Sequence, residues 1–437
     1  MDRNINATYD RPIIIRAALN SKVIFETKKG DPFVFNIFNS SNILVVGPFI
    51  VRSGTYYTVG ARNSTNVTLS NFKIYNSTRW AILVSGLHIL VSHNYAEDCV
   101  MLNSNCRSTS WTQCYATSAI NSYVPILSQN ITFLNNEITK SWGEGIDIIL
   151  ASNVLVKGNV ITDVFPVQIY VDNSKNVVIE GNVLRDTHRE FCSNHTEYHA
   201  IAIGNESWPP KLVSTVNITI KNNFIWGTRF GIAYWGTSAS AYYSDVTISH
   251  NTFFNISSSA LAFQNSCVVK GKSVNNQFKN NFIYSNYMWN AAIVNSSEAS
   301  GWNISSNVYV TDYPKVQSDT WNGTDGNTHS IVFKKKDGNP FKFFQRGFFK
   351  NCTEDMYFQS NVETYCFVPN MNSSLYHKGV KVTYTNLENK NNEDFFNCVR
   401  SNLNPSIGFS EGNAMCFNSG AIYNKVGIII LSLVILL

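Results

Sequence analysis

One short phrase ending in asparagine recurs along most of the chain at nearly constant intervals. The phrase has two apolar residues with one residue between them, one or two polar residues, and then Asn, followed by a second apolar run. Successive copies lie 23 to 30 residues apart, except for two gaps of 42 and 41 residues. Gly47 takes this place in the first copy, and the asparagines are Asn71, Asn94, Asn136, Asn159, Asn182, Asn223, Asn251, Asn281 and Asn307.

This period predicts an all-β fold, a right-handed parallel β-helix whose coils stack into a solenoid. Three short strands joined by turns use ~22–25 residues for one circuit of a coil. A single coil cannot bury its own apolar face, so neighbouring coils stack and like residues form ladders. The handedness follows from the strong preference of parallel crossover connections.

The same period argues against two other repeat architectures. A β-propeller uses ~40–50 residues per unit, and leucine-rich repeats need a leucine consensus that this chain lacks. The gaps of 42 and 41 residues are each one coil with an insertion, or nearly two coils. We expect each repeated Asn to take a left-handed backbone conformation and to hydrogen-bond along the stack.

The pattern divides the chain into three regions. Residues 1–310 form the β-helix, with coils from about Pro12 to Val310 and an N-terminal cap within residues 1–20. Residues 311–417 carry four cysteines and form a C-terminal extension or a small disulfide-containing domain. Residues 418–437 form a hydrophobic tail.

Composition agrees with a repetitive β structure. The chain has 56 asparagines, and only 14% of its residues are charged. Neutral amides stack on copies of themselves without repulsion, whereas like charges do not. The net charge of +5 includes one basic run, at Lys334, Lys335 and Lys336, with no nucleic-acid-binding signature around it. We therefore expect no nucleic-acid partner.

Cysteines and glycosylation motifs favour an extracellular location. None of the nine cysteines forms a CxxC pair, so disulfides are a better explanation than a zinc site. Two disulfides among the last four cysteines are the simplest pairing, and the odd total leaves one thiol free or bonded to another chain. Fifteen Asn-x-Ser/Thr motifs favour secretion, although an Asn-rich chain makes many of them by chance.

The two ends of the chain predict attachment to a membrane. Residues 426–437 read VGIIILSLVILL, which is too short for a membrane-spanning helix. The tail is similar to a GPI-anchor signal with Asn418, Ser419 and Gly420 as the attachment site, or it is a membrane-inserted tail or a buried strand. The N-terminus lacks the leader that a GPI signal requires, so we expect the true start to lie upstream of Met1.

Two phrases one coil apart resemble a known family. They read SWGEGIDII, with Trp142, Glu144 and Asp147, and VQIYVDNS, with Tyr170 and Asp172. Most of residues 40–310 resembles the pectate-lyase-like β-helix superfamily, and within it a group of repeat proteins with a WGEGxD phrase. The resemblance implies the fold. The chain lacks the Asp-Asp pair, His-Gly and Arg-Ile-Lys of polygalacturonases and the Tyr-Gly-x-Asp-Pro-His of alginate epimerases, so no mechanism carries over.

The repeat places one polar surface. Counting back twelve residues from the repeated Asn puts Asp147 and Tyr170 at the same height in adjacent coils, with Asp147 pointing outwards between two inward isoleucines. Superfamily enzymes hold oligosaccharides on such a sheet, and aromatic rings stack on sugars. The alternative is that the aromatics cover a turn or fill a coil end. The predicted substrate contacts are Trp142, Tyr170, Asp172, His199, Tyr234 and Trp235.

A second polar cluster follows Asn182, and its loop is predicted to overhang this sheet. The predicted catalytic residues are Glu144 and Asp147 on the sheet, with Arg185 and His188 from the cluster. A lyase needs a base and an Arg or Ca²⁺ to neutralise the uronate, whereas a hydrolase needs two carboxylates. The alternative is a solvated, glycan-bearing loop. His195 and His199 would pair on a metal only in a helix, so no metal site is predicted.

These observations support two hypotheses about function. The first is a secreted or cell-surface protein that acts on a polysaccharide, as a lyase or a glycoside hydrolase. The second is a non-catalytic adhesin or a glycan-binding structural protein that uses the same sheet and its aromatic residues. In either case we expect a monomer, with a polysaccharide or cell-surface glycan as its partner.

Overall fold

The computed structural model describes eleven segments of the chain. They are residues 7–18, 20–27, 31–106, 113–117, 128–187, 198–206, 215–236, 242–263, 274–284, 302–310 and 331–333.

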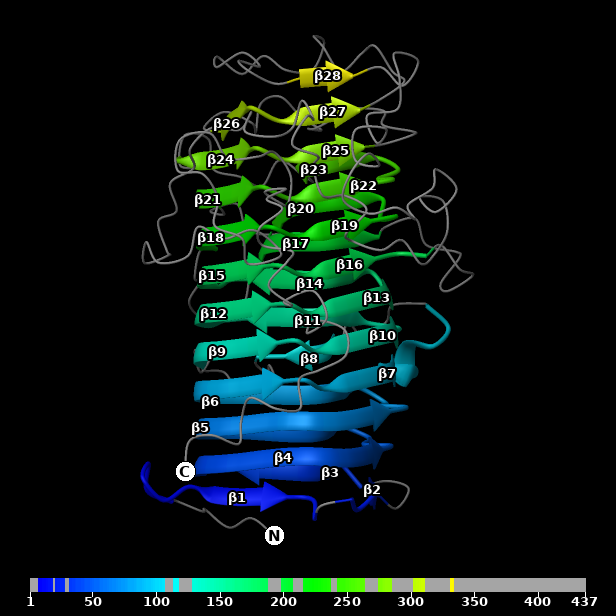
Figure 1. Ribbon diagram of the computed structural model, residues 1–437, viewed down its shortest axis with the longest axis vertical. Helices are drawn as coiled ribbons and strands as arrows, with labels where there is room; N and C mark the ends of the chain where they lie inside the picture. Colours follow the sequence, from blue (N-terminus) through cyan, green and yellow to red (C-terminus); the bar gives the residue numbers. More distant parts are fainter. Residues whose placement is uncertain are drawn as a thin grey trace, which may run out of the picture.

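The described strands build a parallel β-helix, and Figure 1 shows them lying one above another along the long axis of the molecule. From β3 to β23, the coils contribute strands to three stacks, called here A, B and C. All pairings between named strands are parallel, as the repeat predicts. β4, β5 and β6 are long enough to turn corners and take part in more than one stack. The short 3-10 helix η1 (Met101–Asn103) follows β7.

From β6 onwards, each strand of stack A ends two residues before the repeated asparagine. Its strands are β1 (Ile13–Arg16), β4 (Ser41–Arg52), β5 (Tyr57–Tyr75), β6 (Trp80–Ser92), β9 (Ser128–Leu134), β12 (Ala151–Lys157), β15 (Lys175–Glu180), β18 (Val216–Lys221), β21 (Ser244–Ser249), β24 (Asn276–Lys279) and β26 (Trp302–Ser305).

Stack B follows the asparagine. It uses the ends of β4 and β5 together with β2 (Val23–Glu26), β7 (Tyr95–Cys99), β10 (Glu137–Ser141), β13 (Val160–Val164), β16 (Val183–Arg185), β19 (Phe224–Trp226), β22 (Thr252–Phe254), β25 (Phe282–Tyr284), β27 (Val308–Val310) and β28 (Ile331–Phe333).

Stack C completes the coil. It uses the starts of β5 and β6 together with β3 (Phe33–Phe38), β8 (Gln113–Ala116), β11 (Glu144–Ile149), β14 (Val167–Asp172), β17 (His199–Asn205), β20 (Phe230–Gly236) and β23 (Ser259–Phe263).

Apolar rows from the three stacks fill the interior. In stack A, Val156, Ile179 and Ile220 occupy the same position in successive coils, and none of them is accessible to solvent. Burying one such side chain contributes about 1.5–3 kcal/mol. Because every coil adds to these rows, the interior forms one continuous core.

A ladder of buried asparagines runs along the corner between stacks A and B. Each Asn Nδ2 donates to the Oδ1 of the Asn in the next coil, at 3.0 or 3.1 Å, from Asn94 to Asn307. A neutral amide is both donor and acceptor, so one residue type can repeat without limit. The predicted hydrogen bonding along the stack is confirmed. The direct bonds from Asn94 to Asn136 and from Asn182 to Asn223 also show that each long gap is one coil with an insertion.

Two details of the ladder were predicted wrongly. The left-handed residue is the one before each ladder Asn, for example Asn135 at φ 53° and Gly158 at φ 68°. Asn71 has this left-handed conformation, at φ 59°, and Phe72 holds the ladder position, where its N–H donates to Asn94 Oδ1. A left-handed turn and a buried amide favour the same residue type, which is why the two positions are easily confused in sequence.

The first described strand, β1, starts next to the predicted beginning of the coils at Pro12. β1 pairs along its length with β4, so it is the first strand of stack A within the predicted cap. Its Ile14 is 58% exposed. At the other end β28 adds a strand beyond Val310. The described residues do not include most of 311–417, the four cysteines there, or the tail at 418–437. Within the described residues, no helix is both long and apolar enough to cross a membrane.

Candidate functional site

Two carboxyl groups share the outer face of β11 in stack C. Asp147 pairs in register with Tyr170 of β14. Its neighbours Ile146 and Ile148 are fully buried in the core. Since side chains alternate along a strand, Asp147 points outwards, as the repeat predicts.

Glu144 reaches the same face because Gly145 interrupts this alternation. In a regular strand, residues three apart point to opposite faces. A Cβ at Gly145 would collide with the carbonyl oxygen of Gln168 and would lie 3.2 Å from Ile161 Cγ2, which is a core atom. Glycine therefore packs against the interior here, and Glu144 is left close enough to Asp147 for the two carboxyls to hydrogen-bond.

The two carboxyls form a proton-sharing pair. Burial raises the pKa of Glu144 to about 7, against the opposing effect of hydrogen bonds from Asp147 and Gln113. Burial raises the pKa of Asp147 well above its usual range, and the charges of Glu144 and Asp172 raise it further. Burial disfavours a negative charge on either carboxyl, so the two share a proton and titrate as a unit.

Both members of the pair are enclosed. Glu144 is 5% exposed and Asp147 is 1% exposed. Among the described residues, Glu144 Oε2 and Asp147 Oδ1 have no hydrogen-bond partner. A buried carboxyl oxygen without a partner is costly, so its retention points to a role other than stability.

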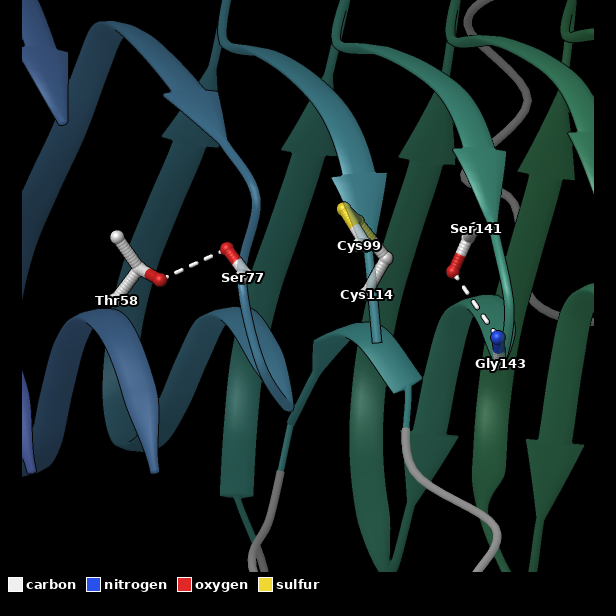
Figure 2. The surroundings of a disulfide bond; sticks show 6 residues. All are labelled: Thr58, Ser77, Cys99, Cys114, Ser141 and Gly143. Atoms are coloured by element: carbon white, nitrogen blue, oxygen red, sulfur yellow. Dashed lines mark hydrogen bonds between the residues drawn. A yellow bond between two sulfur atoms is a disulfide. The ribbon is translucent and has the colours of Figure 1, made fainter. Parts of the chain in front are cut away.

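Gln113 lies directly beside Glu144 in the preceding coil. It opens β8 and pairs in register with Glu144. Its Oε1 accepts a hydrogen bond from Trp80 Nε1 at 2.7 Å. The disulfide between Cys99 and Cys114 ties β8 to the end of β7, as Figure 2 shows.

Tyr170 covers the next coils of stack C. Its ring lies over Gly204, where any Cβ would collide with it. Its hydroxyl donates to Glu206 Oε1 at 2.7 Å. The Glu206 N–H donates to Asn173 Oδ1 at 2.7 Å and to Asp172 Oδ1 at 3.3 Å. These bonds hold a tyrosine and two further carboxyls next to the pair.

His199 lies in the same outward row as Glu144, two coils further along. Burial lowers its pKa to about 4, and the positive charge of Arg229 lowers it further. Its ring meets the Phe230 ring edge-on, with centroids 5.1 Å apart. The imidazole is therefore neutral at pH 7.

The structure does not bring Arg185, one of the two predicted cationic residues, to the pair. Arg185 lies in stack B, where its register partners are Thr162 and Trp226. Its charge acts instead on Glu137, where it opposes the rise in pKa caused by burial. His188 lies outside the described residues.

Three predicted aromatic contacts have different surroundings. Trp142 packs against the buried cluster of Cys106 and Phe165 at the turn before β11, which agrees with the alternative that it covers a turn. The side chain of Trp235 lies outside the described residues, although its backbone pairs with Gly204.

The prediction that Tyr234 contacts substrate is wrong, because its side chain points into the core. Tyr234 is 1% exposed, and its ring meets the Tyr243 ring edge-on at 4.3 Å. The outward residue of β20 is Ala233, which pairs in register with Ala202 and Ala262.

Sequence reasoning missed Trp80, Gln113 and Glu206. The sequence contained the information needed to place Gln113. If the 42-residue gap is read as one coil with an insertion, β8 aligns with β11 and Gln113 lies beside Glu144. Glu206 follows the last residue of β17, and nothing in the sequence links it to Tyr170. In the described segments, no group of three or more His, Cys, Asp or Glu side chains could hold a metal ion.

Comparison with known families agrees with the fold. Residues 57–243 match the family model described as a right handed beta helix region. The chain therefore contains a right-handed β-helix region, and the predicted handedness is confirmed. The chain matches no curated protein.

Several solved structures are similar to the chain at low identity. Alginate lyase from Paenibacillus sp. str. FPU-7 is 11% identical over 75% of this chain and 86% of that one, with a TM-score of 0.43. Pectate lyase Pel9A is 14% identical over 94% and 82%, with a TM-score of 0.44. The Streptococcus pneumoniae surface protein and adhesin PfbA is 14% identical over 63% and 79%, with a TM-score of 0.45. Similarity at this level does not carry over an activity.

Proposed function

We propose that the protein acts on a polysaccharide at the outer face of stack C, with Glu144 and Asp147 as one acid–base unit. The observation that carries this proposal is the proton-sharing pair itself. A general acid or base works best with a pKa near the working pH, and the pKa of Glu144 is raised to about 7. Strongly perturbed carboxyls gather at functional sites, because elsewhere their burial only lowers stability.

Hydrolysis fits the described residues better than elimination. A lyase that removes a proton beside a uronate carboxylate needs a neighbouring cation. Arg185 lies on another stack and does not supply one. Hydrolysis needs an acid and a base, and the inventory of carboxyls around Tyr170 offers both.

Asp172 is the partner that we assign to the pair. Two carboxyls that hydrogen-bond to each other stand too close to flank a glycosidic bond, so Glu144 and Asp147 act together. Asp172 lies one strand across and two residues along from Asp147. Spacings of ~4.8 Å between strands and ~3.3 Å per residue put their backbones about 8 Å apart. Both side chains leave adjacent strands on the same face, so we expect a similar separation of the carboxyls, within the ~6.5–9.5 Å of inverting glycosidases, and therefore inversion.

A panel of neutral and uronate polysaccharides tests this proposal. We expect new reducing ends from a neutral glycan, inverted anomers by NMR, and a loss of about 100-fold or more in Glu144→Gln and Asp147→Asn. Glu97→Gln is a matched control, because Glu97 is a half-buried carboxyl of stack B that bonds Tyr95. Wild-type activity in both pair variants, or no product from any glycan, would refute the enzyme proposal.

Non-catalytic glycan binding is the second candidate, and the near-complete burial of the two carboxyls favours it. In that case the wild-type protein retains a glycan on an affinity column and releases no product. Glu144→Gln would then bind the glycan as tightly as the wild type, and neither protein would release product. Under the enzyme proposal the wild type releases product, and Glu144→Gln binds the glycan without cleaving it.

We also propose that the protein works outside the cell. Disulfides persist in oxidising compartments, and the described residues include Cys99–Cys114 and a disulfide-bonded Cys106. Asn63 and Asn76 are exposed glycosylation motifs, so we expect glycans on both in protein from its native host. Alkylation of Cys99 and Cys114 in unreduced native protein would contradict this location.

A further inference from the structure

We propose that Trp80 and Gln113 form a hydrogen-bonded relay that decides which carboxyl of the pair carries the proton. In catalysis this relay rests on the proposed function, in which Trp80 and Gln113 would be positioning residues. The relay itself is a property of the folded chain, and it can be measured without any substrate.

The three polar groups occupy one outward row of stack C. Register pairs place Leu83 beside Ala116, and therefore Trp80 beside Gln113. Gln113 in turn lies beside Glu144. Trp80 is 9% exposed and Gln113 is 7% exposed, so water competes little for their polar atoms.

Trp80 fixes which end of the Gln113 amide faces the pair. An indole N–H can only donate, so the group at 2.7 Å from Trp80 Nε1 must be the amide oxygen of Gln113. The amide NH₂ then points along the row in the opposite direction, where the next residue is Glu144. Without Trp80 the amide could rotate and present its oxygen to the carboxyl.

We infer that the Gln113 NH₂ donates to Glu144, its register neighbour, and thereby settles the proton on Asp147. An N–H donor stabilises the ionised form of the carboxyl that it meets, and here that carboxyl is Glu144. Asp147 Oδ1 has no donor among the described residues. The proton shared by the pair therefore stays on Asp147, and Glu144 is the member that gives up its proton near neutral pH.

The strand that carries Gln113 is anchored on both sides of this contact. Cys114 is the next residue, and its disulfide to Cys99 fixes the start of β8 (Figure 2). Just beyond β8, the Thr117 N–H donates to the Asp147 carbonyl at 3.1 Å, and Thr117 Oγ1 accepts from the Ile149 N–H at 2.9 Å. A four-residue strand is thereby held against the strand that carries the pair.

Carboxyl titration by ¹³C NMR, with labelled glutamate in the full-length protein, tests the relay. The Glu144 resonance is identified by its absence from Glu144→Gln. We expect Gln113→Leu to raise the pKa of Glu144 by about one to two units, because one donor to an ionised group is lost. Trp80→Phe keeps the ring and removes the indole N–H, so we expect a smaller shift in the same direction.

Tyr57→Phe is the matched control. Tyr57 lies in the same row one coil below Trp80, and its hydroxyl donates to Asn36 Oδ1 at 2.8 Å, away from the pair. We expect no shift in this variant. A Glu144 titration that is unchanged in Gln113→Leu overturns the relay. If that variant does not fold, Trp80→Phe decides, and a shift no larger than that of Tyr57→Phe overturns it.

The same titration separates this inference from the proposed function. If the wild-type protein cleaves no glycan, but the pKa of Glu144 still rises in Gln113→Leu, the relay stands and the enzyme proposal is refuted. If the protein is active, and neither Gln113→Leu nor Trp80→Phe changes the Glu144 titration or the pH–rate profile, the proposed function stands and the relay is refuted.

Discussion

Replacing Asn159 by alanine should break the asparagine ladder between Asn136 and Asn182. The Asn159 side chain makes four hydrogen bonds, two donated to Phe133 O and Asn182 Oδ1 at 3.0 Å, and two accepted from the backbone N and Nδ2 of Asn136 at 2.9 and 3.0 Å. The residue is fully buried, so water cannot replace them.

The size of the effect follows from which groups lose their partner. Asn136 Nδ2 still donates to Val91 O, and Asn182 Oδ1 still accepts from the Asn159 backbone. The Asn136 N–H and the Phe133 carbonyl lose a bond in a buried site, at about 1–3 kcal/mol each. With the loss of side-chain packing we expect the free energy of unfolding to fall by about 3–6 kcal/mol.

Urea unfolding followed by circular dichroism measures this change, as the shift in midpoint multiplied by the slope m. Asn153→Gly is the control. Asn153 is exposed, accepts one bond from Asn176 Nδ2 and has φ 57°, which glycine adopts freely. We expect this control to stay within about 1 kcal/mol of the wild type. An Asn159→Ala variant no less stable than Asn153→Gly would refute the stacking of the amides.

Three further outcomes follow from the site. Folding raises the pKa of Glu144 from 4.5 to about 7, so the folded chain binds an extra proton between these values. Through this group alone the free energy of unfolding should fall by roughly 3 kcal/mol from about pH 4.5 to 7, and the raised pKa of Asp147 should add to the fall. Urea titrations should give a flatter profile for Glu144→Gln than for the wild type, and equal slopes would contradict this. Removing the Cys99–Cys114 disulfide, which closes a separation of 15 residues, should cost about 3 kcal/mol in the same assay, and a loss under about 1 kcal/mol would argue against it. Tyr170→Phe should lose about 1–2 kcal/mol with its bond to Glu206, and a double-mutant cycle with Glu206→Gln that shows no coupling would count against that contact.

The fold could be predicted because each coil repeats the same physical requirements. A buried amide that bonds to its own copy forces Asn at one position of every coil, and apolar rows mark the strands around it. The error at Asn71 arose because the left-handed position before the ladder also favours Asn, as in Asn135–Asn136 and Asn280–Asn281. Residue type alone could not distinguish the ladder position from the left-handed position one residue before it.

The site was predicted only where the repeat is regular. Asp147 and Tyr170 lie in coils of 23 residues, so counting placed them correctly. Gln113 lies in the coil with the long insertion, where counting fails. Tyr234 was misplaced because apolar residues occupy both alternating positions of FGIAYWG, so the sequence does not show which side chains face the core. Arg185 was assigned to a loop, but β16 carries it into stack B.

The state of the Asp147 carboxyl at mildly alkaline pH tests the central claim most directly. Difference infrared spectroscopy just above the Glu144 titration, which lies near pH 7, reports any carboxyl that is still protonated. We predict such a signal in the wild type and its loss in Asp147→Asn. A wild-type protein with no protonated carboxyl at this pH, or a signal that persists in Asp147→Asn, would contradict the proton-sharing pair.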